Sequence, residues 1–211
     1  MPDLPISSLP ELTAVTANSE FAVEYSGTTY KIKQSTLSPL PAVYGLYSQT
    51  GNSVTVSATT VESSIIGLGV GTLTIPANGF KIGDSFRADF GGLISSKGND
   101  DIRIRIKSGS VLLSDSLVQN MRAAINDVFQ LSVIFTIRKL GTAGNAEIVT
   151  LGVYHNERQS TGQPEGFAFN AVNNTTFDTT VSNTLVVTAQ FSSASALNSI
   201  YSDIFILNKI Y

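Results

Sequence analysis

The stretch Asp101-Ile102-Arg103-Ile104-Arg105-Ile106-Lys107 alternates isoleucine with a charged residue over its whole length. Because successive side chains of a β-strand point to opposite faces, this pattern places the isoleucines on one face and the charges on the other. Such a division is typical of an antiparallel strand with one face on a core and the other in water. The stretch therefore predicts a β-sheet protein.

Further strand-like runs extend this prediction along the chain. Turn residues separate them, including Gly98-Asn99, Gly109 and Asn173-Asn174. Only Leu117–Val128 offers a candidate helix, and it is equally consistent with a loop or a helical turn. About eight strands at this spacing predict an all-β, antiparallel sandwich of jelly-roll or related Greek-key type, with an immunoglobulin-like sandwich as the alternative. The runs cover residues 53–57, 81–90, 129–138, 147–154, 184–191 and 202–211.

Composition excludes several classes of function. Of the 211 residues only 14% are charged, and the net charge is −3, which argues against a protein that binds the phosphates of nucleic acid. The chain has no cysteine, so disulfides, thiolate zinc sites and cysteine nucleophiles are excluded. No apolar run reaches the length of a signal peptide core or a membrane span, so we expect synthesis in a cytoplasm without classical export and no membrane insertion.

The first 44 residues differ from the rest. Pro2, Pro5 and Pro10 favour an extended arm. Two alternating runs, 20–25 and 28–33, follow around a two-residue turn and predict a β-hairpin. A two-stranded hairpin is marginally stable alone, so this module is expected to need a partner surface. We therefore expect two parts, residues 1–44 as an arm with a hairpin and residues 45–211 as the sandwich.

Candidate catalytic motifs have simpler structural explanations. The run Gly67-Leu68-Gly69-Val70-Gly71 leads into a strand-like sequence instead of a helix, so close backbone packing explains it better than phosphate binding. His155 is the one histidine and is expected to be exposed at a strand end. Asn99-Asp100-Asp101 lacks the spacing of a calcium loop, and a turn followed by a strand accounts for it. The sequence thus predicts no enzyme, no cofactor and no metal.

Aromatic residues beside polar segments are the best candidates for recognition, since rigid rings give contact area at low entropic cost. The Asn-, Thr- and Gly-rich stretch from about residue 155 to 183 is expected to form loops, which commonly carry binding sites on a rigid scaffold. The candidates for contact with a receptor or glycan are Tyr154, His155, Phe167, Phe169 and Phe177.

The last strand-like run is apolar on both faces. Ile204, Ile206 and Ile210 alternate with Phe205 and Leu207. An exposed edge strand does not normally carry apolar residues on both faces, so we expect a central strand, buried between sheets or against neighbouring subunits. The residues assigned to the core or to an oligomer interface are Phe205, Leu207 and Tyr211.

Two regions resemble viral proteins. Ile6-Ser7-Ser8-Leu9-Pro10, together with the runs 21–25 and 27–32, resembles the N-terminal attachment segments of bacteriophage and large-virus fibre or spike proteins. Residues 78–86, 101–107 and 198–211 resemble the jelly-roll heads of such proteins, which look like the tumour necrosis factor fold.

This resemblance implies a virion component. It implies a homotrimer whose N-terminal arm docks on a capsid or tail protein and whose jelly-roll head faces outward, where it can meet a host surface receptor. A glycan-binding lectin or adhesin and, more remotely, a glycan hydrolase are the alternatives. The residues expected to hold the partner protein are Ile6, Leu9, Phe21, Val23, Tyr25, Tyr30 and Ile32.

Overall fold

The structure is a computed structural model that describes residues 20–25, 28–33, 44–157 and 164–211. The chain divides into two units, Met1–Pro41 and Ala42–Tyr211. The described residues form strands, turns and bends but no helix, so the prediction of an all-β protein is confirmed.

Fourteen strands make up the described structure. The first two form the hairpin of the N-terminal unit, and the other twelve form one sheet in which every pairing is antiparallel. Their bounds are β1 Glu20–Tyr25, β2 Thr28–Lys33, β3 Tyr44–Gln49, β4 Val56–Ser57, β5 Ser63–Ser64, β6 Gly69–Gly71, β7 Thr74–Ile75, β8 Ser85–Ser108, β9 Val111–Asp115, β10 Gln119–Lys139, β11 Glu147–Glu157, β12 Pro164–Asn173, β13 Asn183–Phe191 and β14 Ser199–Lys209.

The N-terminal hairpin has the predicted register. Strands β1 and β2 pair along their whole length, from Glu20 opposite Lys33 to Tyr25 opposite Thr28. Phe21 lies opposite Ile32, and Val23 lies opposite Tyr30. The hairpin predicted from the alternating runs is therefore confirmed at the level of the backbone.

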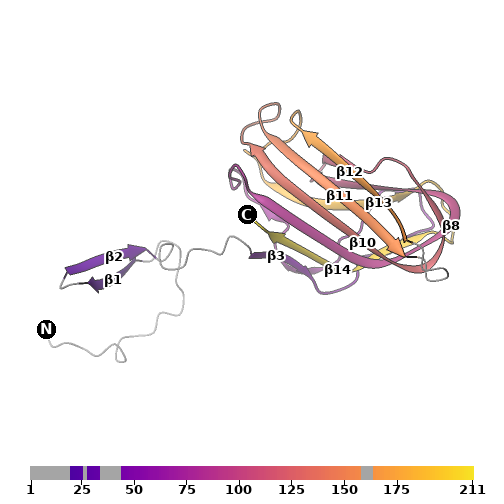
Figure 1. The fold of residues 1–211 in the computed structure, drawn as a ribbon, viewed down its shortest axis with the longest axis horizontal. Helices are drawn as coiled ribbons and strands as arrows, with labels where there is room; N and C mark the ends of the chain where they lie inside the picture. The colour runs from indigo at the N-terminus through magenta and orange to yellow at the C-terminus, as the bar shows by residue number, and fades with distance from the viewer. Residues whose placement is uncertain (1–19, 26–27, 34–43, 158–163) are drawn as a thin grey trace, which may run out of the picture. The chain divides into compact units, whose positions relative to one another are not determined.

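Strand β8 joins two layers of the sandwich. Its first half, up to Ser95, lies between β10 and β14, whereas its second half, from Ile102, lies between β9 and β13. It runs the length of the sandwich and bends at one end (Figure 1). The first layer has the order β12-β11-β10-β8-β14-β3-β6, and the second contains β9, β13 and the end of β8.

The predicted turn at Gly98-Asn99 is wrong, because the chain continues through it as one strand. Both residues have positive φ angles, 85° and 52°, and the pairing of β8 with β10 changes register beside them. An extra residue in one strand bends and twists it without reversing it. Glycine and asparagine adopt positive φ angles readily, and they are favoured both where a strand bends and where a chain reverses. The pair Gly98-Asn99 therefore does not distinguish a bend from a turn in the sequence.

The candidate helix at Leu117–Val128 is also corrected. Most of it belongs to β10, which follows a break at Leu117, where φ is 57°. Two irregularities shift the register of β10 against β8, so Met121, Ala124 and Asp127 point inward at intervals of three residues. A spacing of three is typical of a helix, and here two bulges in a strand produce it.

The core lies between the two layers. Ile102, Ile104 and Ile106 are fully buried, as the alternation in their segment predicted. Around one interior space, Phe86 and Leu207 of the first layer face Leu113 of β9 from the second. The large aromatic and branched side chains of both layers thus share one core, which sets the orientation of the outward residues.

Candidate functional site

Four of the five candidates for receptor contact lie on a pair of strands. Tyr154 and His155 belong to β11, and Phe167 and Phe169 belong to β12, which pairs with β11 from Ile148 to Glu157. Phe177 is buried and packs on Phe80, with ring centroids 6.0 Å apart. The expectation of loops is therefore wrong for residues 155–157 and 164–173, which extend a sheet, and correct for residues 174–182, which contain Phe177. The role of the five candidates in binding a receptor or glycan stays a prediction. Of the five candidates, His155 alone has an exposed side chain.

The aromatic rings of Phe129, Tyr154 and Phe167 form a row across β10, β11 and β12. Tyr154 stacks on Phe129 of β10, with centroids 5.8 Å apart, and on Phe167 of β12, with centroids 4.7 Å apart. Phe169 lies opposite Gly152, where an added Cβ would come within 2.3 Å of the Phe169 ring. The row packs against the core, so the rings hold β10, β11 and β12 together.

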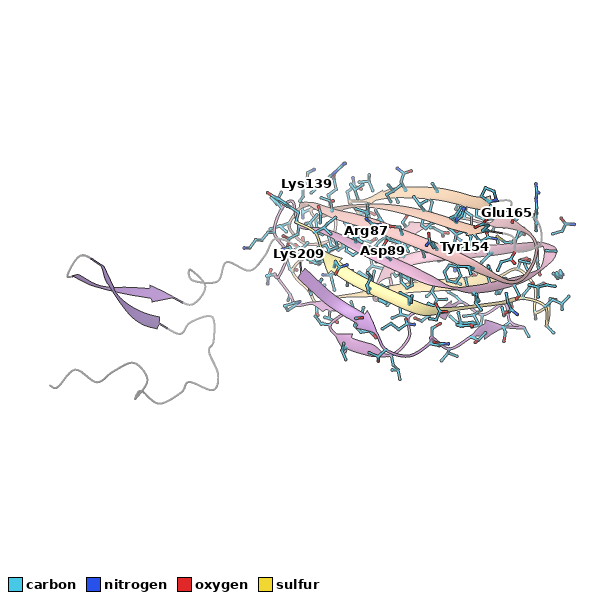
Figure 2. The ribbon with its side chains drawn as sticks, turned by 60° about the horizontal axis from the view of Figure 1, so that its bottom comes forward. Arg87, Asp89, Lys139, Tyr154, Glu165 and Lys209 are labelled. Carbon is cyan, nitrogen blue, oxygen red and sulfur yellow. The ribbon has the colours of Figure 1, made fainter. Side chains whose placement is uncertain are left out.

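A hollow of about 560 Å³ opens at the end of this row. Tyr154 and Asn156 reach it from β11, and Glu165 lies opposite Asn156 on β12. Figure 2 shows Tyr154 and Glu165 toward one end of the sandwich and Lys139 and Lys209 toward the other. The lining consists of Gln119, Asn120, Met121, Arg122, Tyr154, Asn156, Pro164, Glu165, Gly166 and Phe167.

Polar atoms in this hollow lack partners. The hydroxyl of Tyr154 and both amide atoms of Asn156 are buried, and none of them has a hydrogen-bond partner. By contrast, Arg122 Nε lies 3.2 Å from Glu165 Oε1. The large majority of buried side-chain polar atoms in folded proteins are hydrogen-bonded. The unpaired phenol and amide therefore mark a place where another molecule can supply the missing bonds.

The electrostatics keep Tyr154 neutral. Burial raises the pKa of its phenol well above the usual range, and the nearby carboxylates of Glu165 and Asp127 raise this pKa further. The hydroxyl thus remains a hydrogen-bond donor and acceptor at physiological pH. Together with the neutral amide of Asn156, it is suited to holding an uncharged polar molecule.

Sequence reasoning missed most of this lining, including Arg122, Asn156 and Glu165. The signal for Asn156 is the alternation of β11, in which Ile148, Tyr154 and Asn156 share the inward face. A polar side chain at an inward position beside an aromatic one is unusual. It becomes visible only when the strand is extended beyond the predicted end at residue 154.

A second surface feature is the outer face of the first layer. On β10 and β11, Ile134 and Leu151 lie directly opposite each other, and Val153 follows on the same side. On β14, Ile204 and Ile206 also point outward. This outer face exposes seven large apolar side chains: Val128, Ile134, Leu151, Val153, Val172, Ile204 and Ile206.

The charges in the middle of the outer face are paired with each other. Arg87 Nε lies 2.9 Å from Asp89 Oδ2, and Ser132 donates a hydrogen bond of 2.8 Å to Asp89 Oδ1. Both charged residues belong to β8, between the apolar group on β10 to β12 and the apolar group on β14 (Figure 2). The centre of the outer face therefore combines apolar side chains with no net charge.

The closing strand is central, as predicted. β14 lies between β8 and β3, and Phe205 stacks on Phe90 with ring centroids 4.2 Å apart. Phe205 and Leu207 are buried in the core, whereas the side chain of Tyr211 is exposed. On the outward side of β14, Ile204 and Ile206 are not covered by any described part of the chain.

The predicted anchor residues are only partly described. Ile6 and Leu9 lie outside the described residues. Phe21, Val23 and Tyr25 belong to β1, and Tyr30 and Ile32 belong to β2. Their place on the hairpin agrees with the register given above, and their role in binding a partner stays a prediction.

The glycine run and the aspartate segment have structural roles. An added Cβ at Gly71, where φ is 96°, would lie 2.1 Å from the carbonyl oxygen of Leu46, which confirms a close backbone approach. Asp100 accepts hydrogen bonds from the hydroxyls of Ser192, at 2.6 Å, and Ser193 and from the amide of Asn198. Asp100 thereby ties the connection between β13 and β14 to β8.

Within the described ranges, no three His, Asp or Glu side chains come together as a metal site. In the same part of the chain there is no helix long and apolar enough to cross a membrane. Comparison with protein-family models and with curated proteins finds no match for this chain.

Proposed function

We propose that this chain is a structural protein of a virus particle, a fibre, a spike or a capsid decoration, whose sandwich is a jelly-roll head that assembles as a homotrimer. Residues 1–44 anchor the chain to a capsid or tail protein, and the head faces the host. The resemblance of residues 6–32 to viral attachment segments supports the anchor, and the outer face of the first layer supports the assembly.

The single observation that carries the assembly is the exposed apolar surface of the outer face. Large exposed apolar side chains gathered on one face of a sheet commonly mark an interface. Leu151 and Ile134 form a direct cross-strand pair, and Ile206 lies beyond the Arg87–Asp89 pair. A second copy of the chain fits this surface, because a face whose central charges neutralise each other meets no like-charge repulsion when it packs against copies of itself.

The N-terminal hairpin supports an anchor that folds onto a partner. It has only two strands, β1 and β2, and an isolated two-stranded hairpin is marginal in water. A sheet edge supplied by a capsid or tail protein would complete its hydrogen bonding. Under this proposal the protein is located in the virion after synthesis in the host cytoplasm.

A charge placed on the outer face tests the assembly. The variant Leu151→Lys puts an ammonium on the proposed interface, and Leu112→Lys, on β9 of the second layer, is its matched control. Leu151 is 44% exposed and Leu112 is 42% exposed, so the two variants disturb folding similarly. In sedimentation equilibrium we expect trimers for the parent and for Leu112→Lys, and monomers for Leu151→Lys. A monomeric parent, or equal behaviour of the two variants, contradicts the proposal.

Deletion of residues 1–41, which leaves β3 intact, tests the anchor separately. The truncated chain is expected to keep the oligomeric state of the parent, because the sandwich holds the outer face. Its recovery in particles purified from infected cells is expected to fall at least tenfold. Incorporation equal to that of the full chain would show that the N-terminal residues are not the anchor.

A further inference from the structure

The hollow at the end of the aromatic row is not explained by assembly through the outer face. Tyr154 and Asn156 approach it from the inward side of β11, and the outer face is on the opposite side of that strand. Its volume of about 560 Å³ lies within the usual range of small-molecule sites, roughly 300–1,000 Å³, and far exceeds the space of one ordered water.

The unpaired atoms of the hollow are its strongest pointer to a ligand. Tyr154 and Asn156 are each 1% exposed, and yet the phenol oxygen and both amide atoms have no partner. An unpaired polar atom in the interior destabilises a fold, and a leucine or phenylalanine at these positions would avoid the penalty. Such an arrangement is expected where a bound molecule completes the hydrogen bonds.

The chemistry of the lining selects the ligand. An amide offers two donors and an acceptor, and a phenol offers one donor and an acceptor, which together match the hydroxyl groups of a sugar. The partly buried ring of Phe167 and the exposed Pro164 supply apolar surface for the C–H groups of a pyranose. The polar and apolar elements of the site thus fit the two kinds of surface on a carbohydrate.

The charges of the site disfavour an anionic ligand. Among the lining residues that the structure describes, Arg122 is the one cation, and it is paired with Glu165. Asp127 adds a second carboxylate close enough to Tyr154 to raise the pKa of its phenol. Because its guanidinium is already paired, Arg122 is not available to hold a sialylated, sulfated or phosphorylated group.

We propose that this hollow binds a neutral carbohydrate, a hexose or N-acetylhexosamine unit, through the amide of Asn156 and the hydroxyl of Tyr154. The inference goes beyond the assembly proposal and does not rest on it. A monomeric protein would keep the site, because the described lining lies on β10, β11 and β12, which pair within the chain.

The test uses the full chain on an array of immobilised glycans, in EDTA. Neutral glycans end in glucose, galactose, mannose, N-acetylglucosamine or N-acetylgalactosamine, and a second set is sialylated or sulfated. We expect binding to at least one neutral series and none to the acidic set. Absence of binding to every neutral glycan, binding to acidic glycans only, or binding that requires added Ca²⁺ would each overturn the proposal.

Two variants locate the binding in the hollow. Tyr154→Phe removes the unpaired hydroxyl and keeps the stacked ring, so we expect an unchanged or higher Tm and affinity at least tenfold weaker. Tyr47→Phe is the matched control, because the Tyr47 hydroxyl donates a hydrogen bond of 2.7 Å to the Gly67 carbonyl oxygen away from the hollow. It is expected to lower Tm and leave glycan binding unchanged. Equal affinity of Tyr154→Phe and the parent would refute the assignment.

Discussion

Strand β8 supplies one row of side chains to the outer face of the first layer and another to the outer face of the second layer, and the two rows differ in charge. The first row contains the neutralising pair Arg87 and Asp89, followed by Gly91 and Leu93. The second row is Arg103, Arg105 and Lys107. One strand with a single inward pattern therefore faces two different surroundings on its outward side.

The second face binds its cations to carboxylates from neighbouring strands and loops. Arg105 Nη1 lies 2.8 Å from Glu62 Oε2, and Lys107 also pairs with Glu62. Arg103 makes a bidentate contact with Asp115. Such a network is stable in water and resists close packing against a copy of itself, because desolvating several ions is costly. This difference in charge indicates that the outer face of the second layer is stable in contact with water, whereas the outer face of the first layer is suited to contact with another protein surface.

The largest effect is expected from a substitution in the core under β14, because the outer faces of both layers lie over this core. Phe205→Ala deletes a ring stacked on Phe90 and is expected to cost about 4 kcal/mol of unfolding free energy. The neighbouring Ile206 points outward, so Ile206→Thr is expected to change the free energy by about 0.5 kcal/mol or less in the monomer. Urea unfolding at low protein concentration measures both. Similar losses would show that Ile206 is not a surface residue.

The second prediction concerns the junction between the two layers, where Asp100 holds the chain. Burial alone would raise the pKa of its carboxyl, but hydrogen bonds from Ser192, Ser193 and Asn198 lower it far below the usual value of 3.8. The carboxylate oxygens of Asp100 accept hydrogen bonds from Ser192, Ser193 and Asn198. In Asp100→Asn an NH2 group, which only donates, replaces one of these oxygens. We expect the free energy of unfolding to fall by about 3 kcal/mol at pH 7.

The pH dependence of this loss follows from the lowered pKa of Asp100 in the folded state. Because the pKa is lower in the folded state, the ionised carboxylate stabilises the fold fully above pH 3.8, and this contribution disappears as the pH falls below that value. The difference between the parent and Asp100→Asn should therefore shrink on acidification. Guanidinium unfolding at pH 7, 5 and 3 measures it, and a difference that stays constant to pH 3 would exclude this role.

The smallest effect is expected on the charged face. Burial raises the pKa of Glu62, yet contacts with Lys107, Thr188 and Arg105 lower it overall. The side chain of Glu62 is partly exposed, so Glu62→Gln is expected to cost only about 1 kcal/mol, and less in 1 M NaCl. Thermal unfolding at low and high salt provides the measurement. A loss that salt does not reduce would mean that packing, and not charge, holds this face.

Much of the fold could be predicted from local pattern. The alternation of Ile102, Ile104 and Ile106 identified a strand with one buried side, and the runs around residues 26–27 identified the hairpin. Bulges defeated the same reasoning. Gly98-Asn99 bends β8 without ending it, and β10 takes on a helix-like spacing because its register shifts against β8.

The candidate site was harder to predict than the fold. Tyr154 and Phe167 were singled out for their aromatic rings, and the structure stacks them face to face on adjacent strands. Asn156 was missed, because an asparagine in a polar stretch looks like any loop residue. Its importance comes from its burial and its missing partners, which depend on how β10, β11 and β12 meet.

The sequence by itself determined the strand class and the inward side of the segment 101–107, and it predicts the two-part organisation, because these depend on alternation and turn residues within short segments. Only the tertiary structure decided which outward residues lie beside one another. Leu151 and Ile134 become neighbours, and Tyr154 and Asn156 reach a common hollow, through pairings between distant segments. Periodicity carries no information about strand order, so the outer face and the hollow arise only when the sheet is assembled.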